Sequence, residues 1–167
     1  MKILLFSLGA LVLAPVLNAQ QQAPCKQSPE FRQFDFWIGE WEVRNPKGEK
    51  VGDSSIQLII NDCVIFENYT GVKGYTGKSF NIYNAPLKKW QQFWVDSQGG
   101  VLEFSGSATP DKLEYKAVST QQDGKTLHHR MTFFDMPDKT VRQLWEQSTD
   151  GGKQWATVFD GTYVKKK

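Results

Sequence analysis

The 167-residue chain lacks most of the motifs by which a sequence identifies an enzyme or a metalloprotein. It has two histidines and two cysteines, too few for a metal site built from several such ligands. It contains no G-x-S-x-G, no H-E-x-x-H and no phosphate-binding loop, which are the usual signatures of hydrolases, zinc proteases and nucleotide-binding proteins. We therefore expect a protein that is not an enzyme and that carries no metal or cofactor.

An excess of charge of one sign is also missing. Twenty Lys and Arg residues stand against 18 Asp and Glu residues, which gives a formal net charge of +2. A balance this close to neutral gives no electrostatic reason to expect nucleic acid or an anionic membrane as a partner. The three lysines at positions 165–167 form the basic run at the C-terminus, and such a run is typical of a solvated chain end.

Long hydrophobic runs are confined to the N-terminus. Lys2 precedes the apolar stretch 3–13, Pro15 follows it, and Ala19 supplies a small residue before a cut. This order is typical of a cleavable signal peptide over residues 1–19, and the stretch is shorter than the roughly 20 residues that span a bilayer. We expect export to the periplasm or the extracellular space, with no membrane insertion after cleavage.

The two cysteines, Cys25 and Cys63, lie in a part of the chain that is predicted to reach an oxidising compartment. An even number of cysteines in that setting favours a disulfide. The residues directly before Cys25 do not fit the lipid-attachment pattern of lipoproteins. We therefore predict a Cys25–Cys63 bond that ties the N-terminal segment to an early strand.

The mature chain has the size of one domain. Residues 20–29 are polar and lack periodicity, which indicates a linker, and residues 30–167 form the predicted domain. Ser28, Pro29 and Glu30 are typical of a helix start. Gly39 limits that helix to one or two turns over 30–38.

From Glu40 onward, runs rich in β-branched and aromatic residues alternate with turn sequences that contain Gly, Pro, Asn or Asp. This pattern predicts about ten strands, and their short connections favour antiparallel pairing of neighbours in an all-β, up-and-down barrel. The predicted strands are 40–45, 50–60, 63–70, 77–84, 88–96, 101–107, 112–120, 126–135, 140–148 and 154–164.

Alternation along the strands indicates which side chains face inward. Strands 88–96 and 140–148 carry apolar residues on both faces, and we assign their tryptophans to the inside. The other inward sets are Ile56, Leu58 and Ile60; Leu113, Tyr115 and Ala117; Leu127, His129, Met131 and Phe133; and Trp155, Phe159 and Tyr163.

The run FDFWIGEWEV at 34–43 places Gly39 and Trp41 at the start of the first predicted strand. This arrangement resembles the opening of lipocalins and related calycin barrels, in which the tryptophan closes one end and the glycine lets the helix turn tightly into the strand. Together with KWQQFWVD at 89–96 and VRQLWEQSTDGGKQW at 141–155, it also resembles a family of bacterial exported domains of unknown function. The resemblance implies a lipocalin-like barrel over 25–164 and brings no activity with it.

Residues 148–155 match the S-x-D-x-G-x-x-W pattern of the Asp-box found in sialidase-type propellers. A propeller needs several blades, and this chain has a single copy. We interpret the match as a set of residues that stabilise a hairpin loop, with Asp150 accepting backbone N–H bonds, the glycines at positive φ, and Trp155 packing over the loop.

The predicted inner faces mix aromatic with polar residues, as ligand pockets do. The leading hypothesis is a barrel that holds a small apolar or aromatic molecule, with Trp94, Trp145 and Tyr115 as walls and Gln92, His129 and Gln143 as orienting groups. One alternative is that the amides bond one another inside a filled barrel that acts as a structural or interaction module. Another is a haem-binding barrel, with His129 as the iron ligand.

Overall fold

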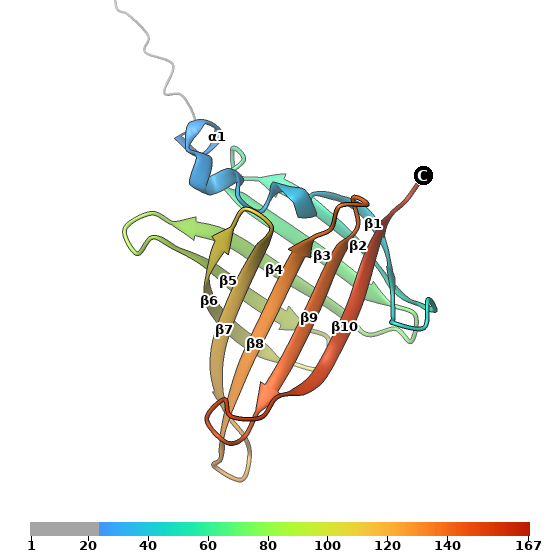
Figure 1. The fold of residues 1–167 in the computed structure, drawn as a ribbon, viewed down its shortest axis with the longest axis vertical. Helices are drawn as coiled ribbons and strands as arrows, with labels where there is room; N and C mark the ends of the chain where they lie inside the picture. Colours follow the sequence, from blue (N-terminus) through green and yellow to red (C-terminus); the bar gives the residue numbers. More distant parts are fainter. Residues whose placement is uncertain (1–23) are drawn as a thin grey trace, which may run out of the picture.

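The computed structural model describes residues 24–167 as a closed barrel of ten antiparallel strands with a short helical segment at its N-terminal end (Figure 1). The predicted signal peptide, its cut after Ala19 and the first residues of the predicted linker lie outside the described residues. Within 24–167, no helix has the length and apolar character needed to cross a membrane.

Each strand pairs with its neighbours in sequence, and β1 pairs with β10 to close the barrel. This confirms the predicted all-β antiparallel barrel of ten strands, and the predicted strand limits agree with the observed ones to within two residues. The strands are β1 (Gly39–Arg44), β2 (Lys50–Ile59), β3 (Val64–Gly71), β4 (Thr76–Asn84), β5 (Lys89–Asp96), β6 (Val101–Thr109), β7 (Lys112–Thr120), β8 (Thr126–Asp135), β9 (Val141–Ser148) and β10 (Ala156–Lys165).

The N-terminal segment is a chain of single turns. It comprises α1 (Pro24–Gln27), η1 (Pro29–Arg32) and η2 (Asp35–Trp37). Residues 24–27 of the predicted linker therefore form a helical turn, and two 3₁₀ turns replace the single helix predicted over 30–38. The segment lies across the end of the barrel at which β1 begins (Figure 1).

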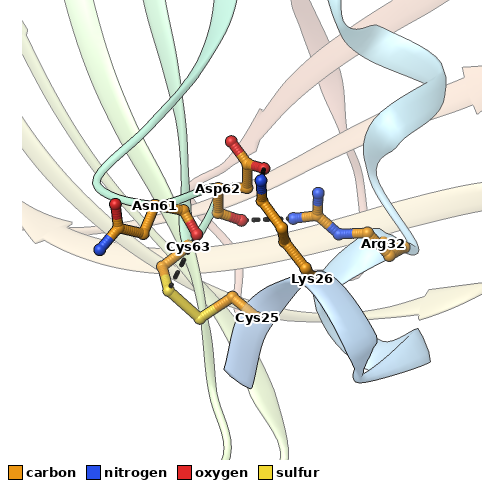
Figure 2. Close-up of a disulfide and its surroundings, with 6 residues drawn as sticks. All are labelled: Cys25, Lys26, Arg32, Asn61, Asp62 and Cys63. Carbon is orange, nitrogen blue, oxygen red and sulfur yellow. Dashed lines mark hydrogen bonds and ion pairs between the residues drawn. A yellow bond between two sulfur atoms is a disulfide. The ribbon is translucent and has the colours of Figure 1, made fainter. Parts of the chain in front are cut away.

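A disulfide and two polar contacts fasten this segment to the turn between β2 and β3 (Figure 2). Cys25 and Cys63 are bonded, as predicted, with their Cα atoms 5.0 Å apart. Lys26 Nζ lies 3.1 Å from a carboxylate oxygen of Asp62, and Arg32 donates to the Asp62 carbonyl at 2.6 Å. A disulfide-bonded chain fits a protein of the periplasm or the extracellular space.

Aromatic side chains of the segment close this end of the barrel. Phe34 and Trp37 are fully buried, and their stacked rings lie 4.9 Å apart. Trp37 also lies 4.6 Å from the Phe133 ring, and Trp41 donates its indole N–H to the Trp37 carbonyl at 2.8 Å. Gly39 has φ of 145°, a value that favours glycine, so the chain can turn there from η2 into β1.

The predicted inward faces of the seventh and eighth strands are confirmed, since Leu113, Tyr115, Met131 and Phe133 are buried. Ile60 was predicted to face inward with its neighbours in β2, and this is wrong. The strand ends at Ile59, so Ile60 lies in the following turn and is 67% exposed.

The inward assignment of Trp155 is also wrong, because β10 begins only at Ala156 and Trp155 belongs to the preceding loop. Its indole N–H donates to the Gly152 carbonyl at 2.9 Å, and the Arg130 guanidinium lies 4.4 Å from the ring centre. Asp150 accepts the backbone N–H groups of Lys153 and Gln154, each at 2.9 Å. The interpretation of these residues as ones that stabilise a hairpin loop is therefore confirmed.

Candidate ligand cavity

The half of the barrel away from the helical segment contains a cavity of about 240 Å³. It lies between the ends of strands that carry inward-facing aromatic residues. Its aromatic walls include Tyr69, Tyr75, Trp94, Phe104, Trp145 and Phe159. Leu102, Met131 and Val158 add aliphatic and thioether surface, and Val158 is itself 46% exposed at the rim. The cavity thus combines an apolar wall with access from solvent.

Small residues on β2 and β4, the two strands that flank β3, leave this half hollow. The inward positions of β2 and β4 at this level hold Gly52, Ser54, Gly77 and Ser79. A Cβ at Gly77 would lie only 2.1 Å from the Trp94 ring, so the indole can take its place in the wall only because this position has no side chain. Large side chains on the opposite strands therefore face small ones here and do not fill the space.

A buried carboxyl group lies at the floor of the cavity. Glu67 faces inward from β3, is 3% exposed and lines the cavity. It accepts hydrogen bonds from Ser54 Oγ at 3.1 Å and from Ser79 Oγ at 3.0 Å. Burial raises the pKa of Glu67 to about 7, although these hydroxyl groups favour the ionised form.

The polar floor continues through Tyr163 and Gln143. The Tyr163 hydroxyl donates to Gln143 Oε1 at 2.6 Å and lies 3.5 Å from Glu67 Oε1. Because a phenol has one proton, the shorter contact to Gln143 takes it. The Gln143 amide N–H in turn donates to Met131 Sδ at 2.9 Å.

Asn81 connects the other side of the floor. Its amide oxygen accepts from Gln92 Nε2 at 2.9 Å and from the Tyr115 hydroxyl at 3.1 Å. Its amide nitrogen donates to Ser79 Oγ at 2.9 Å, which joins this group to Glu67. Hydrogen bonds through Asn81 and Ser79 thus link Gln92 to Glu67, the Tyr163–Gln143 pair lies beside this group, and both glutamines also line the cavity.

His129 lies behind the wall and holds Trp145. The Trp145 indole N–H donates to His129 Nδ1 at 3.2 Å, and Ser119 Oγ lies 2.8 Å from Nε2. Because Nδ1 accepts, Nε2 carries the proton and donates to Ser119. Burial, followed by the charge of His128, lowers the pKa of His129, so the ring is neutral at pH 7.

These contacts give no support to haem ligation by His129, because both ring nitrogens already have partners. The cavity wall does not include His129. In the part of the chain that the structure describes, no group of three or more His, Cys, Asp or Glu side chains is placed to hold a metal ion.

The structure brings four of the six predicted site residues together at the cavity, namely Gln92, Trp94, Gln143 and Trp145. The other two act on the far side of the wall. Tyr115 is fully buried beneath the cavity and bonds Asn81, and His129 positions Trp145.

Glu67 is the main residue that sequence reasoning missed. Its strand alternates Ile65, Glu67 and Tyr69 with a second face that includes Val64 and Phe66. Both faces contain apolar side chains, so alternation alone does not show which one is inside. The signal that was present is an acidic residue between two apolar neighbours at positions i−2 and i+2.

Comparison of the chain with models of known protein families and with the sequences of curated proteins finds no match. The resemblance to a family of exported domains, and to lipocalins in particular, therefore stays a prediction. The inference about function below therefore rests on the geometry of the cavity.

Proposed function

We propose that this protein is an exported, lipocalin-like barrel that binds a small apolar or aromatic molecule without transforming it chemically. One observation carries the proposal: the half of the barrel away from the helical segment contains a mainly apolar cavity with a few buried polar groups at its floor. Ligand sites generally have this composition. Since pockets for drug-sized molecules have volumes of roughly 300–1,000 Å³, a cavity of about 240 Å³ suits a smaller compound, about the size of one or two rings.

The wall and the floor have separate roles in this proposal. The indole rings of Trp94 and Trp145 provide flat apolar surface for the ligand, and burial of that surface supplies most of the affinity. The amides of Gln92 and Gln143 are held by Asn81 and Tyr163, so they present fixed polar atoms that orient the ligand.

Native mass spectrometry after mild purification tests for a retained ligand, whatever its chemical identity. A second test uses 2-phenylethanol as the probe and tryptophan fluorescence as the signal, because Trp94 and Trp145 line the cavity. Leu102→Trp should fill the cavity and abolish binding. Val101→Trp is the matched control, since Val101 is the next residue on β6 and is 56% exposed.

The proposal predicts binding in the wild type and in Val101→Trp, together with its loss in Leu102→Trp. It is wrong if purified protein carries no small molecule and the probe binds none of the three proteins. It is also wrong if all three bind the probe equally, because binding would then not involve the cavity.

A second candidate function, self-association, is favoured by the outer surface. Phe66, Phe80 and Phe93 lie opposite one another on three adjacent strands. Phe80 is 43% and Phe93 is 42% exposed, and Ile82 and Val101 extend the same apolar area. Contiguous exposed apolar surface of this kind marks interaction sites, and a two-fold axis through Phe80 would cover it with the same patch of a second copy.

Sedimentation velocity tests this second candidate. The wild type should show a concentration-dependent dimer, and Phe80→Ser should be monomeric. Val118→Ser, which changes a residue that is 64% exposed on β7, should leave the dimer unchanged. A monomeric wild type over the accessible concentration range would remove this candidate.

A further inference from the structure

Glu67 is the one charged residue among the described side chains that line the cavity. Within this part of the chain, the lining contains no lysine, arginine or histidine. Among the described residues, the hydroxyl groups of Ser54 and Ser79 donate to its carboxyl group and the Tyr163 hydroxyl lies 3.5 Å from it, and none of these groups carries a charge. A buried carboxylate without a cationic partner is energetically costly, so its presence at the floor of an open cavity calls for an explanation.

The carboxyl group has unused capacity to accept hydrogen bonds. An ionised carboxylate offers about four lone-pair positions, and the two serines occupy one on each oxygen. The Tyr163 proton is directed to Gln143 at 2.6 Å and not to Glu67 at 3.5 Å. Donors from a bound molecule can therefore be accepted without breaking a bond of the protein.

Aromatic side chains line the same cavity as the carboxyl group. Tyr69, Trp94, Phe104 and Trp145 belong to the same wall. Aromatic rings attract cations through the negative potential of their faces, and this attraction is stronger when the cation is removed from water. An ammonium group in this cavity would meet a carboxylate below it and aromatic rings around it.

We propose that the cavity selects a small organic cation, an amine attached to a compact apolar group, with Glu67 as the counter-charge. This inference rests on the proposed function, because it names the class of ligand that the cavity takes. An ammonium group supplies the missing positive charge and up to three hydrogen-bond donors, and the apolar part of the ligand covers the aromatic wall. An anionic ligand would meet the Glu67 carboxylate with no cation to offset it.

Three probes of the same shape test this selectivity: phenethylamine, 2-phenylethanol and phenylacetate. Their affinities for the wild type and for Glu67→Gln are measured by titration calorimetry at pH 8. We expect the wild type to bind phenethylamine about tenfold to a hundredfold more tightly than 2-phenylethanol, the range typical of a charged hydrogen bond in a buried site. Phenylacetate should bind most weakly.

Glu67→Gln should remove the preference for the amine and leave the affinity for 2-phenylethanol nearly unchanged. Glu103→Gln is the control, since Glu103 is an exposed glutamate that faces outward from β6. It should retain the full preference. Circular dichroism of each variant checks that the barrel is folded.

A second measurement needs only the wild type. Burial holds the pKa of Glu67 at about 7 in the free protein, so most molecules carry a protonated Glu67 at pH 6. A tenfold to hundredfold preference for the ionised form means that binding of an ammonium ion then releases about 0.4 to 0.8 of a proton, and calorimetry in two buffers of different ionisation enthalpy detects it. The affinity for phenethylamine should rise about fivefold to tenfold between pH 6 and pH 8, and 2-phenylethanol should release no proton.

Equal affinities for the amine and the alcohol, or an amine preference that survives in Glu67→Gln, would overturn the inference. Binding of phenethylamine without proton release at pH 6 would overturn it as well. If 2-phenylethanol binds in the cavity and the amine has no advantage, the proposed function stands and this inference fails. If none of the probes binds and no ligand is retained, both fail.

Discussion

The two halves of the barrel interior are built from the same ten strands and differ in how they are filled. At the helical end, Phe34, Trp37 and Phe133 are fully buried against one another. At the other end, the inward side chains enclose a cavity of about 240 Å³ above a buried carboxyl group. The first half therefore resembles an ordinary protein core, and the second resembles a binding site.

This difference shows that dense packing and hollow space are separated along the barrel axis. Aromatic packing and the disulfide stabilise the helical end, and small residues such as Gly77 and Ser79 leave the other end open. A buried polar network and an unfilled volume both reduce stability. The packed half supplies the stability that allows the hollow half to exist.

The largest expected effect comes from truncating the packed half. Trp37→Ala should lower the free energy of unfolding by about 3–5 kcal/mol, because it leaves a large void between rings that contact it on several sides. Trp94→Ala should cost less than about 2 kcal/mol, since one side of this indole already faces the cavity. Urea denaturation monitored by circular dichroism measures both values.

Phe34→Leu serves as a milder test if Trp37→Ala fails to fold, since it keeps an apolar side chain in the same position. It should still lower the free energy of unfolding by more than Trp94→Phe does. Equal losses at the two ends would contradict the distinction between a packed and a hollow half.

Loss of the disulfide should have the next largest effect. Cys25→Ser combined with Cys63→Ser should reduce the free energy of unfolding by about 2–4 kcal/mol, because the bond closes a loop between residues separated by 38 positions. Probe binding to the cavity should change little in the folded variant, because the bond lies at the opposite end. A matched decrease in ligand affinity would show that the two halves are coupled.

Glu67→Gln tests how much the buried carboxyl group at the floor of the cavity lowers the free energy of unfolding. The unfolded chain ionises Glu67 near pH 4.5, and the folded protein ionises it near pH 7. Between these values the folded state binds more protons, so the stability contributed by this group falls as the pH rises. The free energy of unfolding of the variant should about equal that of the wild type at pH 4 and should exceed it by about 3 kcal/mol at pH 8.

Thermal denaturation across this pH range, with Glu103→Gln as the exposed control, separates the effect of burial from that of charge alone. The control should differ from the wild type by less than about 0.5 kcal/mol at every pH. A constant difference between Glu67→Gln and the wild type would show that the carboxyl group is not buried as described.

The fold was more predictable from the sequence than the site. Turn sequences and period-two alternation act locally, and they placed the strands from Gly39 to Lys165 to within two residues. The cysteine pair was predictable because only two cysteines are present. Gln92, Trp94, Gln143 and Trp145 were found because tryptophan next to an amide is an unusual inward combination.

Glu67 and the hollow space required information that the sequence does not hold locally. The cavity exists because Gly77 on β4 lies beside Trp94 on β5, and that contact depends on the register between the two strands. Trp155 was misplaced for a related reason, since its loop folds back onto Arg130. Alternation predicts faces within a strand, and it does not predict where the strand ends.

The smallest expected effect concerns backbone strain at the packed end. Ile60 has φ of 53° in the turn fastened by the disulfide, and a β-branched residue is unfavourable in this left-handed region. Ile60→Asn should raise the free energy of unfolding by about 1 kcal/mol, because asparagine tolerates positive φ and Ile60 is 67% exposed. Val72→Asn is the control, since Val72 is 59% exposed and its φ is not positive. A gain confined to Ile60→Asn, with probe affinity unchanged, would show that the packed end is stable despite a strained turn, which the disulfide and the contacts of Asp62 hold in place.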